Sequence, residues 1–544
     1  MKITGSPKIL FLCLFILGMA LIGGCAPVDR WGVFTPDYEK AAKQKTPPVT
    51  ENPDRYQPRM KEAGAIDAHE PDQPLSLSIE DAIVRALENN RDLRIQQLNP
   101  VIAGTFERIE RGVYDPEIFA EFEYAEETAA QTSRATGEEF SVDATNARTA
   151  AGLRQALPSG TTLEAIAEHG RDQTNRAPDQ RTSRVGLSIT QSLLQGFGPA
   201  VNLVSIRQAE LDTLASIYEL RGFTEALAAD TETAYWNYVL AHEEISIYES
   251  SLAVARKQRD EIEEQIAVGL LPETEAAAAR AEFARREQAL IDARSSMAER
   301  RLRLIHLIYA AGGGRFENKV KATSKPAITP QPITDPADRL ALAEKSRPDL
   351  NEARLRLKQG RLETIATRNG ILPKLDLFVD FGRTGYGDSF SAAFRELNEN
   401  TYDVSAGLRL SHYLKNRTAE ARHEAAWHEQ QQAKRAVDNL RQMVELDVRL
   451  AINEVARTRQ QIAASRATRQ LEEQTLRAEN QRFEVGDSTA LLVAQAQRDL
   501  LIAQIAEVRV ITSYRIALVN LYLAEGSLLE RRGISIGNRL ADRF

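Results

Sequence analysis

The 544-residue chain has few aromatic residues, no surplus of positive charge and no long apolar run outside its N-terminus. Aromatic side chains make up only 6% of the sequence, which argues against large aromatic cores. The formal net charge of −8 gives none of the basic footprint that nucleic-acid binding requires. No helix of the mature chain is predicted to span a bilayer, because about eighteen consecutive apolar residues would be needed. What is present, 43% hydrophobic and 27% charged residues, is typical of a folded protein.

The N-terminus is predicted to be a secretory signal peptide, residues 1–24. Lys2 and Lys8 supply a positive start, and an apolar stretch follows at 9–22. The stretch ends in Leu-Ile-Gly-Gly-Cys, which resembles the cleavage box of bacterial lipoproteins. That resemblance implies that Cys25 becomes the lipidated first residue, carrying acyl chains such as palmitate, and that Ala26 directs the protein to the outer membrane. An ordinary signal peptide with a chance cysteine is the alternative.

Cysteine is scarce: the only other one, Cys13, lies inside the predicted signal. The mature chain therefore has no possible intramolecular disulfide, although it enters an oxidising compartment. Its stability must come from packing and association.

The sequence repeats itself with a period of roughly 220 residues. Val268-Gly269 in "QIAVGLLPETEAAAARAEF" matches Val485-Gly486 in "RFEVGDSTALLVAQAQRDL". Proline-rich linkers flank the first half. The predicted divisions are a signal peptide at 1–24, a tether at 25–77, a first repeat at 78–311, a linker at 312–337, a second repeat at 338–526 and a tail at 527–544.

Each half is predicted to contain a short helix, strands, a very long helix and a second short helix. The helices are expected at 79–112, 201–268, 273–311, 338–370, 418–485 and 489–525, and the strands near 117–128, 147–157, 161–169, 184–194, 374–382 and 402–413. A helix of about 68 residues spans roughly 100 Å, far beyond a globular core. Seven-residue spacings such as Tyr238, Ile245 and Leu252 predict a left-handed supercoiled seam. A rod-like coiled-coil spacer is the simpler interpretation.

The strands argue against a mere rod. In "KLDLFVDF" (374–381), Leu375, Leu377 and Val379 share one face, and Asp376 and Asp380 lie on the other. Apolar and polar alternation is typical of a transmembrane β-barrel, but a soluble half-buried sheet has it too. The outer-membrane address favours the barrel. Four to six strands cannot close one, so several chains must share it.

Several segments together resemble the TolC-like outer-membrane factor family, in its lipoprotein subtype. The resemblance covers about residues 78–526 and is carried by "LSLSIEDAIVRALENNRDL" (75–93), "SLLQGFGPAVN" (192–202), "AYWNYVLAHEEI" (234–245) and the paired turns "VGLLPETEA" and "VGDSTALL". It implies a mainly α fold with a membrane β-barrel: a homotrimer whose duplicated repeats form a trimeric barrel and a long α-helical coiled-coil tunnel. The implied function is the exit duct of a tripartite efflux or type I secretion system, passively conducting substrates from a periplasmic adaptor and an inner-membrane pump.

The resemblance also implies roles for individual residues. The glycine turns become periplasmic tips that dock the adaptor, through Val268, Gly269, Leu270, Val485, Gly486 and Asp487. The narrowest part of the pore falls at Glu275, Leu492 and Gln495. Because two of these three are not acidic, we expect a closed tip held by packing rather than by a carboxylate ring, and weak block by multivalent cations.

The chain departs from the family in two respects. The strand region at about 117–194 is longer than the family's minimal two strands, and adds either an external hairpin or further barrel strands. The arm at 25–78 is also long, which suits a lipid tether in the outer membrane.

Signals for an enzyme, a metal or a cofactor are poor. In "HEAAWH", His423 and His428 are five residues apart, about 140° around a helix, whereas a zinc pair on one helix face is four apart. No catalytic, cofactor or metal site is therefore predicted. The alternative to a duct is a non-spanning periplasmic coiled-coil lipoprotein or adaptor-like scaffold.

Overall fold

The computed structural model describes residues 75–309, 315–325, 333, 335–398 and 401–534, which fall into two compact units. The sheet unit is formed by Ala103–Thr213 and Arg356–Lys434. The helical unit is formed by the described parts of Glu51–Ile102, Leu214–Leu355 and Arg435–Phe544. The predicted signal peptide, Cys25 and nearly all of the predicted tether lie outside the described residues.

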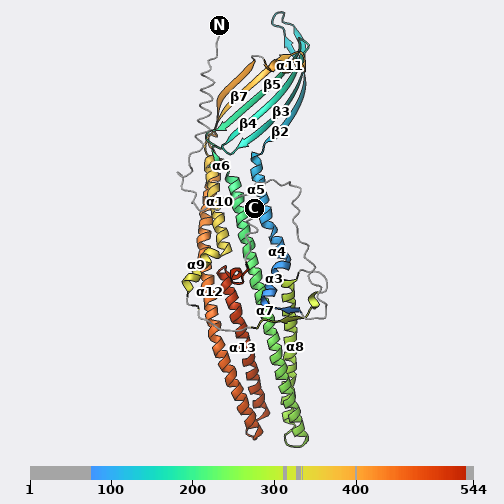
Figure 1. The fold of residues 1–544 in the computed structure, drawn as a ribbon, viewed down its shortest axis with the longest axis vertical. Coiled ribbons are helices and arrows are strands. Elements are labelled where there is room, and N and C mark those ends of the chain that lie inside the picture. The colour runs from blue at the N-terminus through green and yellow to red at the C-terminus, as the bar shows by residue number, and fades with distance from the viewer. Residues whose placement is uncertain (1–74, 310–314, 326–332, 334, 399–400, 535–544) are drawn as a thin grey trace. The chain divides into compact units, whose positions relative to one another are not determined.

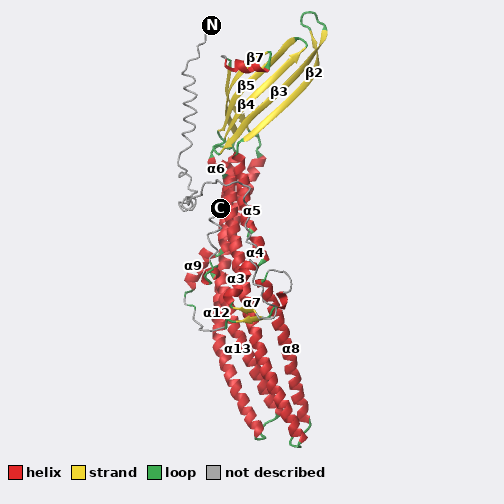
Figure 2. Ribbon diagram, turned by 45° about the vertical axis from the view of Figure 1, so that its right-hand side comes forward, coloured by secondary structure: helices red, strands yellow, loops and turns green. Residues whose placement is uncertain are grey.

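The order of elements repeats in the two halves of the chain (Figures 1 and 2). Each half runs through short helices, antiparallel strands, a helix of more than sixty residues and a helix of 35 residues. The first half comprises β1 (Leu75–Leu77), α3 (Ile79–Asn89), α4 (Arg91–Gln96), α5 (Leu98–Arg111), β2 (Glu117–Thr132), β3 (Glu139–Leu157), β4 (Thr161–Thr174), β5 (Ala177–Ser192), α6 (Pro199–Asn202), α7 (Val204–Ala267) and α8 (Thr274–Ile308). The second comprises β6 (Val320–Ala322), α9 (Pro336–Ser346), α10 (Pro348–Gly370), β7 (Lys374–Gly387), α11 (Phe390–Arg395), β8 (Tyr402–Ser411), α12 (Arg417–Glu484), α13 (Ala490–Ala524) and α14 (Leu528–Arg531).

Two of the six predicted helices were wrong in extent, because the structure divides each of them into shorter helices. The helix expected at 79–112 breaks at Asn90, whose backbone is extended (φ −65°, ψ 127°) and whose side chain accepts a hydrogen bond from the Leu93 N–H to cap α4. The helix expected at 338–370 breaks at Arg347. This residue precedes Pro348, and the proline ring sterically disfavours the helical conformation of the residue before it. The other four predicted helices and all six strands occur, and most of the strands are longer than predicted.

The sheet unit is built on one antiparallel sheet in the order β2-β3-β4-β5-β7-β8. Its register places apolar side chains in rows across one face. One such row runs through all six strands: Ile118, Leu153, Ala165, Leu187, Phe381 and Val404. The predicted face of β7 (Leu375, Leu377, Val379 and Phe381) is confirmed, and this face of the sheet unit is solvent-exposed at Leu187, Phe381 and Val404.

The opposite face of the same sheet is charged. The adjacent row runs through Glu117, Arg154, Glu164, Ser188, Asp380 and Ser405. Arg154 forms an ion pair with Glu164 at 2.8 Å between Nε and Oε2, and Arg148 pairs with Glu168 at 2.8 Å. One face of the sheet is therefore suited to an apolar surrounding and the other to water.

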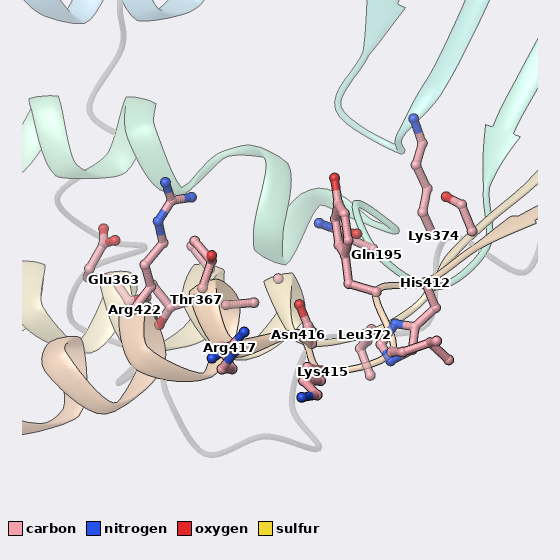
Figure 3. A pocket seen from close by; sticks show the side chains of 17 residues that line it. Gln195, Glu363, Thr367, Leu372, Lys374, His412, Lys415, Asn416, Arg417 and Arg422 are labelled. Atoms are coloured by element: carbon pink, nitrogen blue, oxygen red, sulfur yellow. Dashed lines mark hydrogen bonds between the residues drawn. The ribbon is translucent and has the colours of Figure 1, made fainter.

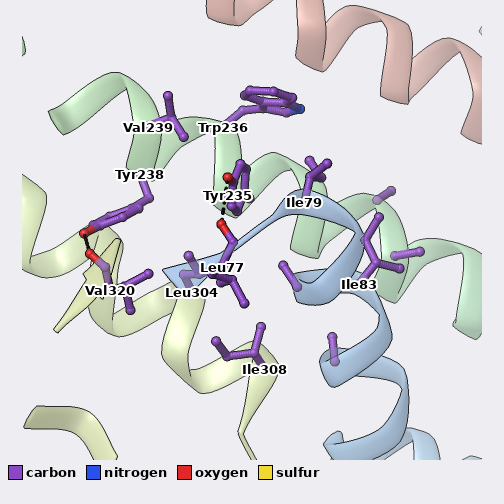
Figure 4. Packing of buried hydrophobic residues seen from close by; sticks show 14 of the residues in the cluster. Leu77, Ile79, Ile83, Tyr235, Trp236, Tyr238, Val239, Leu304, Ile308 and Val320 are labelled. Atoms are coloured by element: carbon purple, nitrogen blue, oxygen red, sulfur yellow. Dashed lines mark hydrogen bonds between the residues drawn. The ribbon is translucent and has the colours of Figure 1, made fainter. Parts of the chain in front are cut away.

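The main core of the helical unit forms where β1 and β6 pair in parallel beside α3, α7 and α8 (Figure 4). Tyr235 and Tyr238 of α7 donate hydrogen bonds to the carbonyl oxygens of Leu77 (3.1 Å) and Val320 (2.6 Å), one in each strand. Leu304 of α8 is completely buried in the same cluster. The tyrosine hydroxyls thus satisfy strand carbonyls that the apolar core would otherwise leave unpaired.

The burial of α7 changes along its length: most of residues 204–241 are buried or half-buried, and exposed residues become frequent only from 242 onward. Along α7, Tyr238, Ala255 and Ile262 are nearly inaccessible, whereas Ile245 and Leu252 are half-buried. At about 1.5 Å per residue, the 64 residues of α7 span roughly 96 Å. The part of α7 at 204–241 is therefore stabilised by burial on several sides, whereas the part at 242–267 is stabilised by a narrower seam that includes Ala255 and Ile262.

Candidate functional site: the two hairpin turns

The first turn lies between α7 and α8, where the sequence predicts a glycine turn at Val268-Gly269. Gly269 adopts a left-handed backbone (φ 81°). The Leu270 N–H donates to the Gln265 carbonyl at 2.8 Å, and the Gly269 N–H donates to Ile266 at 3.0 Å. This pair of bonds is the Schellman motif, which satisfies the last carbonyls of a helix when glycine occupies the left-handed position.

The second turn, between α12 and α13, has the same geometry. Gly486 has φ 79°, the Asp487 N–H donates to Arg482 at 2.8 Å, and the Gly486 N–H donates to Phe483 at 3.1 Å. A Cβ on either turn glycine would meet no atom within 4 Å. Glycine is therefore required at both turns by the backbone angle and not by lack of space.

The turns expose apolar side chains. Val268 is 67% exposed, Leu270 75% and Val485 79%. Asp487 is also exposed and forms an ion pair with Arg482 at 3.3 Å. We call Val268, Gly269, Leu270, Val485, Gly486 and Asp487 the tip residues.

The three predicted aperture residues lie in the helices that follow the turns. Glu275, half-exposed, is in the first turn of α8, where a carboxylate is favoured by the helix dipole. Leu492 and Gln495 are exposed on the first turns of α13, and the Leu492 N–H donates to the Thr489 hydroxyl that caps this helix. Only one of the three is acidic.

An ion-pair cluster that the sequence interpretation missed connects the two hairpins. Glu282 and Arg286 of α8 are both 5% exposed, and their side chains approach to 2.6 Å. Arg498 of α13 reaches Glu282 at 3.7 Å. Burial lowers the pKa of Arg286 from its usual value. The only sequence signal was a glutamate four residues before an arginine, which is common on exposed helices.

A second buried carboxylate, Glu225 of α7, has a raised pKa. Its side chain is 1% exposed and contacts Arg221 at 3.2 Å. Burial raises the pKa of Glu225 to about 7 from 4.5, and the nearby Arg221 only partly opposes the shift. The folded state therefore retains a proton that the unfolded chain releases near pH 4.5.

This shift predicts a pH dependence of stability. The free energy of unfolding should fall as pH rises from about 4.5 to 7, by on the order of 3 kcal/mol, with the full cost present above pH 7. Glu225→Gln should remove that slope, so that the variant melts higher than the parent at pH 8 and similarly at pH 4. Apparent Tm across this pH range measures it, with the exposed Glu530→Gln, which contacts the same Arg221, as control. Parallel profiles for Glu225→Gln and the parent would refute the assignment.

A pocket of about 1100 Å³ lies in the sheet unit beside the start of α12 (Figure 3). Its charged lining consists of Lys374, Lys415, Arg417 and Arg422 against a single carboxylate, Glu363. Four cations and one carboxylate make the pocket suited to an anion and unsuited to a metal ion.

The two histidines of "HEAAWH" contact different neighbours. His423 Nδ1 lies 3.2 Å from the Thr367 hydroxyl, whereas His428 lies 3.9 Å from Glu424 and packs edge-on against Trp427. Within the ranges that the structure describes, no group of three His, Cys, Asp or Glu is placed to hold a metal ion. Over the same ranges, no helix has the length and apolar character needed to cross a bilayer.

Comparison with known proteins identifies the family. The family model described as outer membrane efflux protein matches residues 138–308 and 340–527, which is more than half of the chain. No curated protein matches.

Solved structures share the fold at low sequence identity. A membrane protein from Pseudomonas aeruginosa is 20% identical, with a TM-score of 0.61 over 82% of this chain and 93% of that one. The Campylobacter jejuni CmeC outer membrane channel is 16% identical, with a TM-score of 0.61 over 86% and 91%. VceC from Vibrio cholerae is 16% identical, with a TM-score of 0.61 over 82% and 96%. The chain belongs to the outer membrane efflux protein family, and it serves as an outer-membrane exit duct of an efflux system.

Proposed function

We propose that three copies of the chain form one duct, in which their sheets close a β-barrel in the outer membrane and their helices line a periplasmic tunnel. The six-stranded sheet carries this proposal, because it has one apolar face, one charged face and two edge strands, β2 and β8, without partners in the described chain. An open edge facing lipid leaves N–H and C=O groups unsatisfied at a cost of several kcal/mol each. Further copies of the chain supply the missing partners. In each copy, residues 78–311 form the first repeat of the duct and residues 338–526 form the second.

The tip residues are proposed to dock a periplasmic adaptor, which in turn joins an inner-membrane pump. Two observations support this. The two turns have the same Schellman geometry, so each chain offers the same backbone shape twice. Both turns also expose valine or leucine, whose burial against a partner is favourable by about 25 cal/mol per Å².

The aperture is proposed to rest closed through packing and the Glu282–Arg286–Arg498 cluster. Of the three proposed aperture residues Glu275, Leu492 and Gln495, only Glu275 offers a carboxylate. A ring with so few acids binds multivalent cations weakly.

Lipid attachment at Cys25, outside the described residues, is proposed to hold the long arm of the protein at the outer membrane. The support is the Leu-Ile-Gly-Gly-Cys box, which follows the apolar stretch at 9–22 and ends at Cys25.

Planar-bilayer conductance of the purified full-length protein tests the duct. We expect a detergent-dependent particle of three chains that conducts ions and is little affected by multivalent cations. Cys25→Ser is the control: it should lose labelling by palmitate yet still trimerise and conduct. If Cys25→Ser instead gives a particle that is soluble without detergent, contains one chain and does not conduct, the protein is a periplasmic scaffold.

A further inference from the structure

The first half of the chain contributes four strands to the sheet and the second half contributes two. A duct with two strands from each half would need only four. The additional pair either projects away from the membrane as an external hairpin or belongs to the wall. The hydrogen-bond register and the side-chain pattern distinguish these possibilities.

The neighbouring strands β3 and β4 are paired along the whole length of β4. Fourteen consecutive residue pairs join β3 to β4, from Ala144–Thr174 to Leu157–Thr161, and β4 continues onto β5. An external hairpin would instead leave the sheet and let β2 pair directly with β5. In the described sheet, β3 and β4 occupy the positions between them.

The same two strands continue both faces of the sheet. The apolar row passes from Ile118 through Leu153 and Ala165 to Leu187, with no interruption at β3 or β4. The charged row passes through Arg154 and Glu164, which form an ion pair on the other face. A hairpin in water has no need of an exposed apolar row, whereas a strand in a membrane wall requires one.

The edge strands have opposite directions and exposed apolar side chains. With six antiparallel strands, β2 and β8 run in opposite senses, so β2 of one copy joins β8 of the next in an antiparallel ladder. Ile118 and Phe122 of β2 are 84% and 70% exposed, and Leu408 and Leu410 of β8 are 65% and 68% exposed. Both edge strands are therefore suited to pairing with a second copy of this chain within lipid.

We propose that all six strands of each chain lie in the membrane wall, so that three copies close a ring of eighteen strands. This inference rests on the proposed trimeric duct and specifies its bore. With strands about 4.8 Å apart and tilted by about 40°, eighteen strands enclose a backbone cylinder about 36 Å across, against about 24 Å for twelve. The charged face, including Arg148 and Glu168, lines the passage.

Cysteine labelling at matched positions tests the wall assignment. Ala165→Cys and Glu164→Cys lie in β4, and Phe381→Cys and Asp380→Cys lie in β7 in the same two rows. Each variant is made in the full chain and treated with a membrane-impermeant maleimide, with the parent as blank. We expect Ala165→Cys and Phe381→Cys to react about tenfold more slowly than their neighbours, because lipid covers the apolar face.

The β7 pair separates the two possible failures. If the β7 pair alternates and the β4 pair reacts equally, β3 and β4 form an external hairpin, and only the present inference is overturned. If neither pair alternates, the sheet is not a membrane wall, and the proposed duct fails as well. Electron cryomicroscopy of the trimer gives an independent count: eighteen strands support the inference, and twelve overturn it.

Discussion

Replacing Leu270 and Val485 together by aspartate should lower efflux by about tenfold or more, while the amount of trimer in the outer membrane stays unchanged. Both side chains are largely exposed, so the substitutions remove no packing within the chain. Burying two new carboxylates against an adaptor would leave them unpaired, and such a penalty easily exceeds the roughly 1.4 kcal/mol that corresponds to a factor of ten. Minimum inhibitory concentrations of exported compounds in a strain lacking other ducts give the measurement.

Conservative variants of the same positions are the matched control. Leu270→Met and Val485→Ile keep the apolar surface and should retain efflux. Normal efflux by the double aspartate variant would show that the tips do not dock an adaptor. Gly486 offers a second check: a bulky residue there that left trimer insertion and export intact would also count against docking, because it strains the left-handed turn and changes the tip surface.

Truncation of Leu304 to alanine should strongly destabilise the helical unit. Leu304 is fully buried in the cluster around β1 and β6, where removal of the three outer carbon atoms of its side chain leaves a cavity. Such changes cost about 2–5 kcal/mol. The apparent Tm of the detergent-solubilised protein should fall by several degrees, with a matching drop in its level in the outer membrane.

Leu302, two residues away on α8, provides the control because its side chain is 41% exposed. Leu302→Ala should lower the apparent Tm by well under half as much. Equal losses at the two positions would mean that burial within the chain does not determine the stability of this region.

The long helices and the turns between them could be predicted from sequence because their signals are local. A proline-free run rich in alanine, glutamate and leucine predicts helix, and Val268-Gly269 and Val485-Gly486 mark its end. The structure ends α7 at Ala267 and α12 at Glu484, within one residue of the predicted ends. The alternation along β7 was equally local and was correctly interpreted.

What the sequence did not reveal depends on partners distant in the chain. The break at Asn90 has only an asparagine as its signal, and asparagine occurs within helices as well as at their caps. The contact of Arg498 with Glu282 joins residues more than two hundred positions apart. Likewise, nothing in the residues of β3 and β4 alone decided whether they extend the sheet, because the decisive observation is their register between β2 and β5.

The opposite directions of β2 and β8 limit how such a duct can change in evolution. A single added strand would give the two edge strands the same direction, so neighbouring copies could no longer join in an antiparallel ladder. Strands can therefore be added or lost only as whole hairpins. Threefold repetition multiplies each hairpin into six strands, and each such step alters the diameter by about 12 Å. The barrel diameter among relatives should therefore change in steps, through the gain or loss of one hairpin, and not gradually through single substitutions.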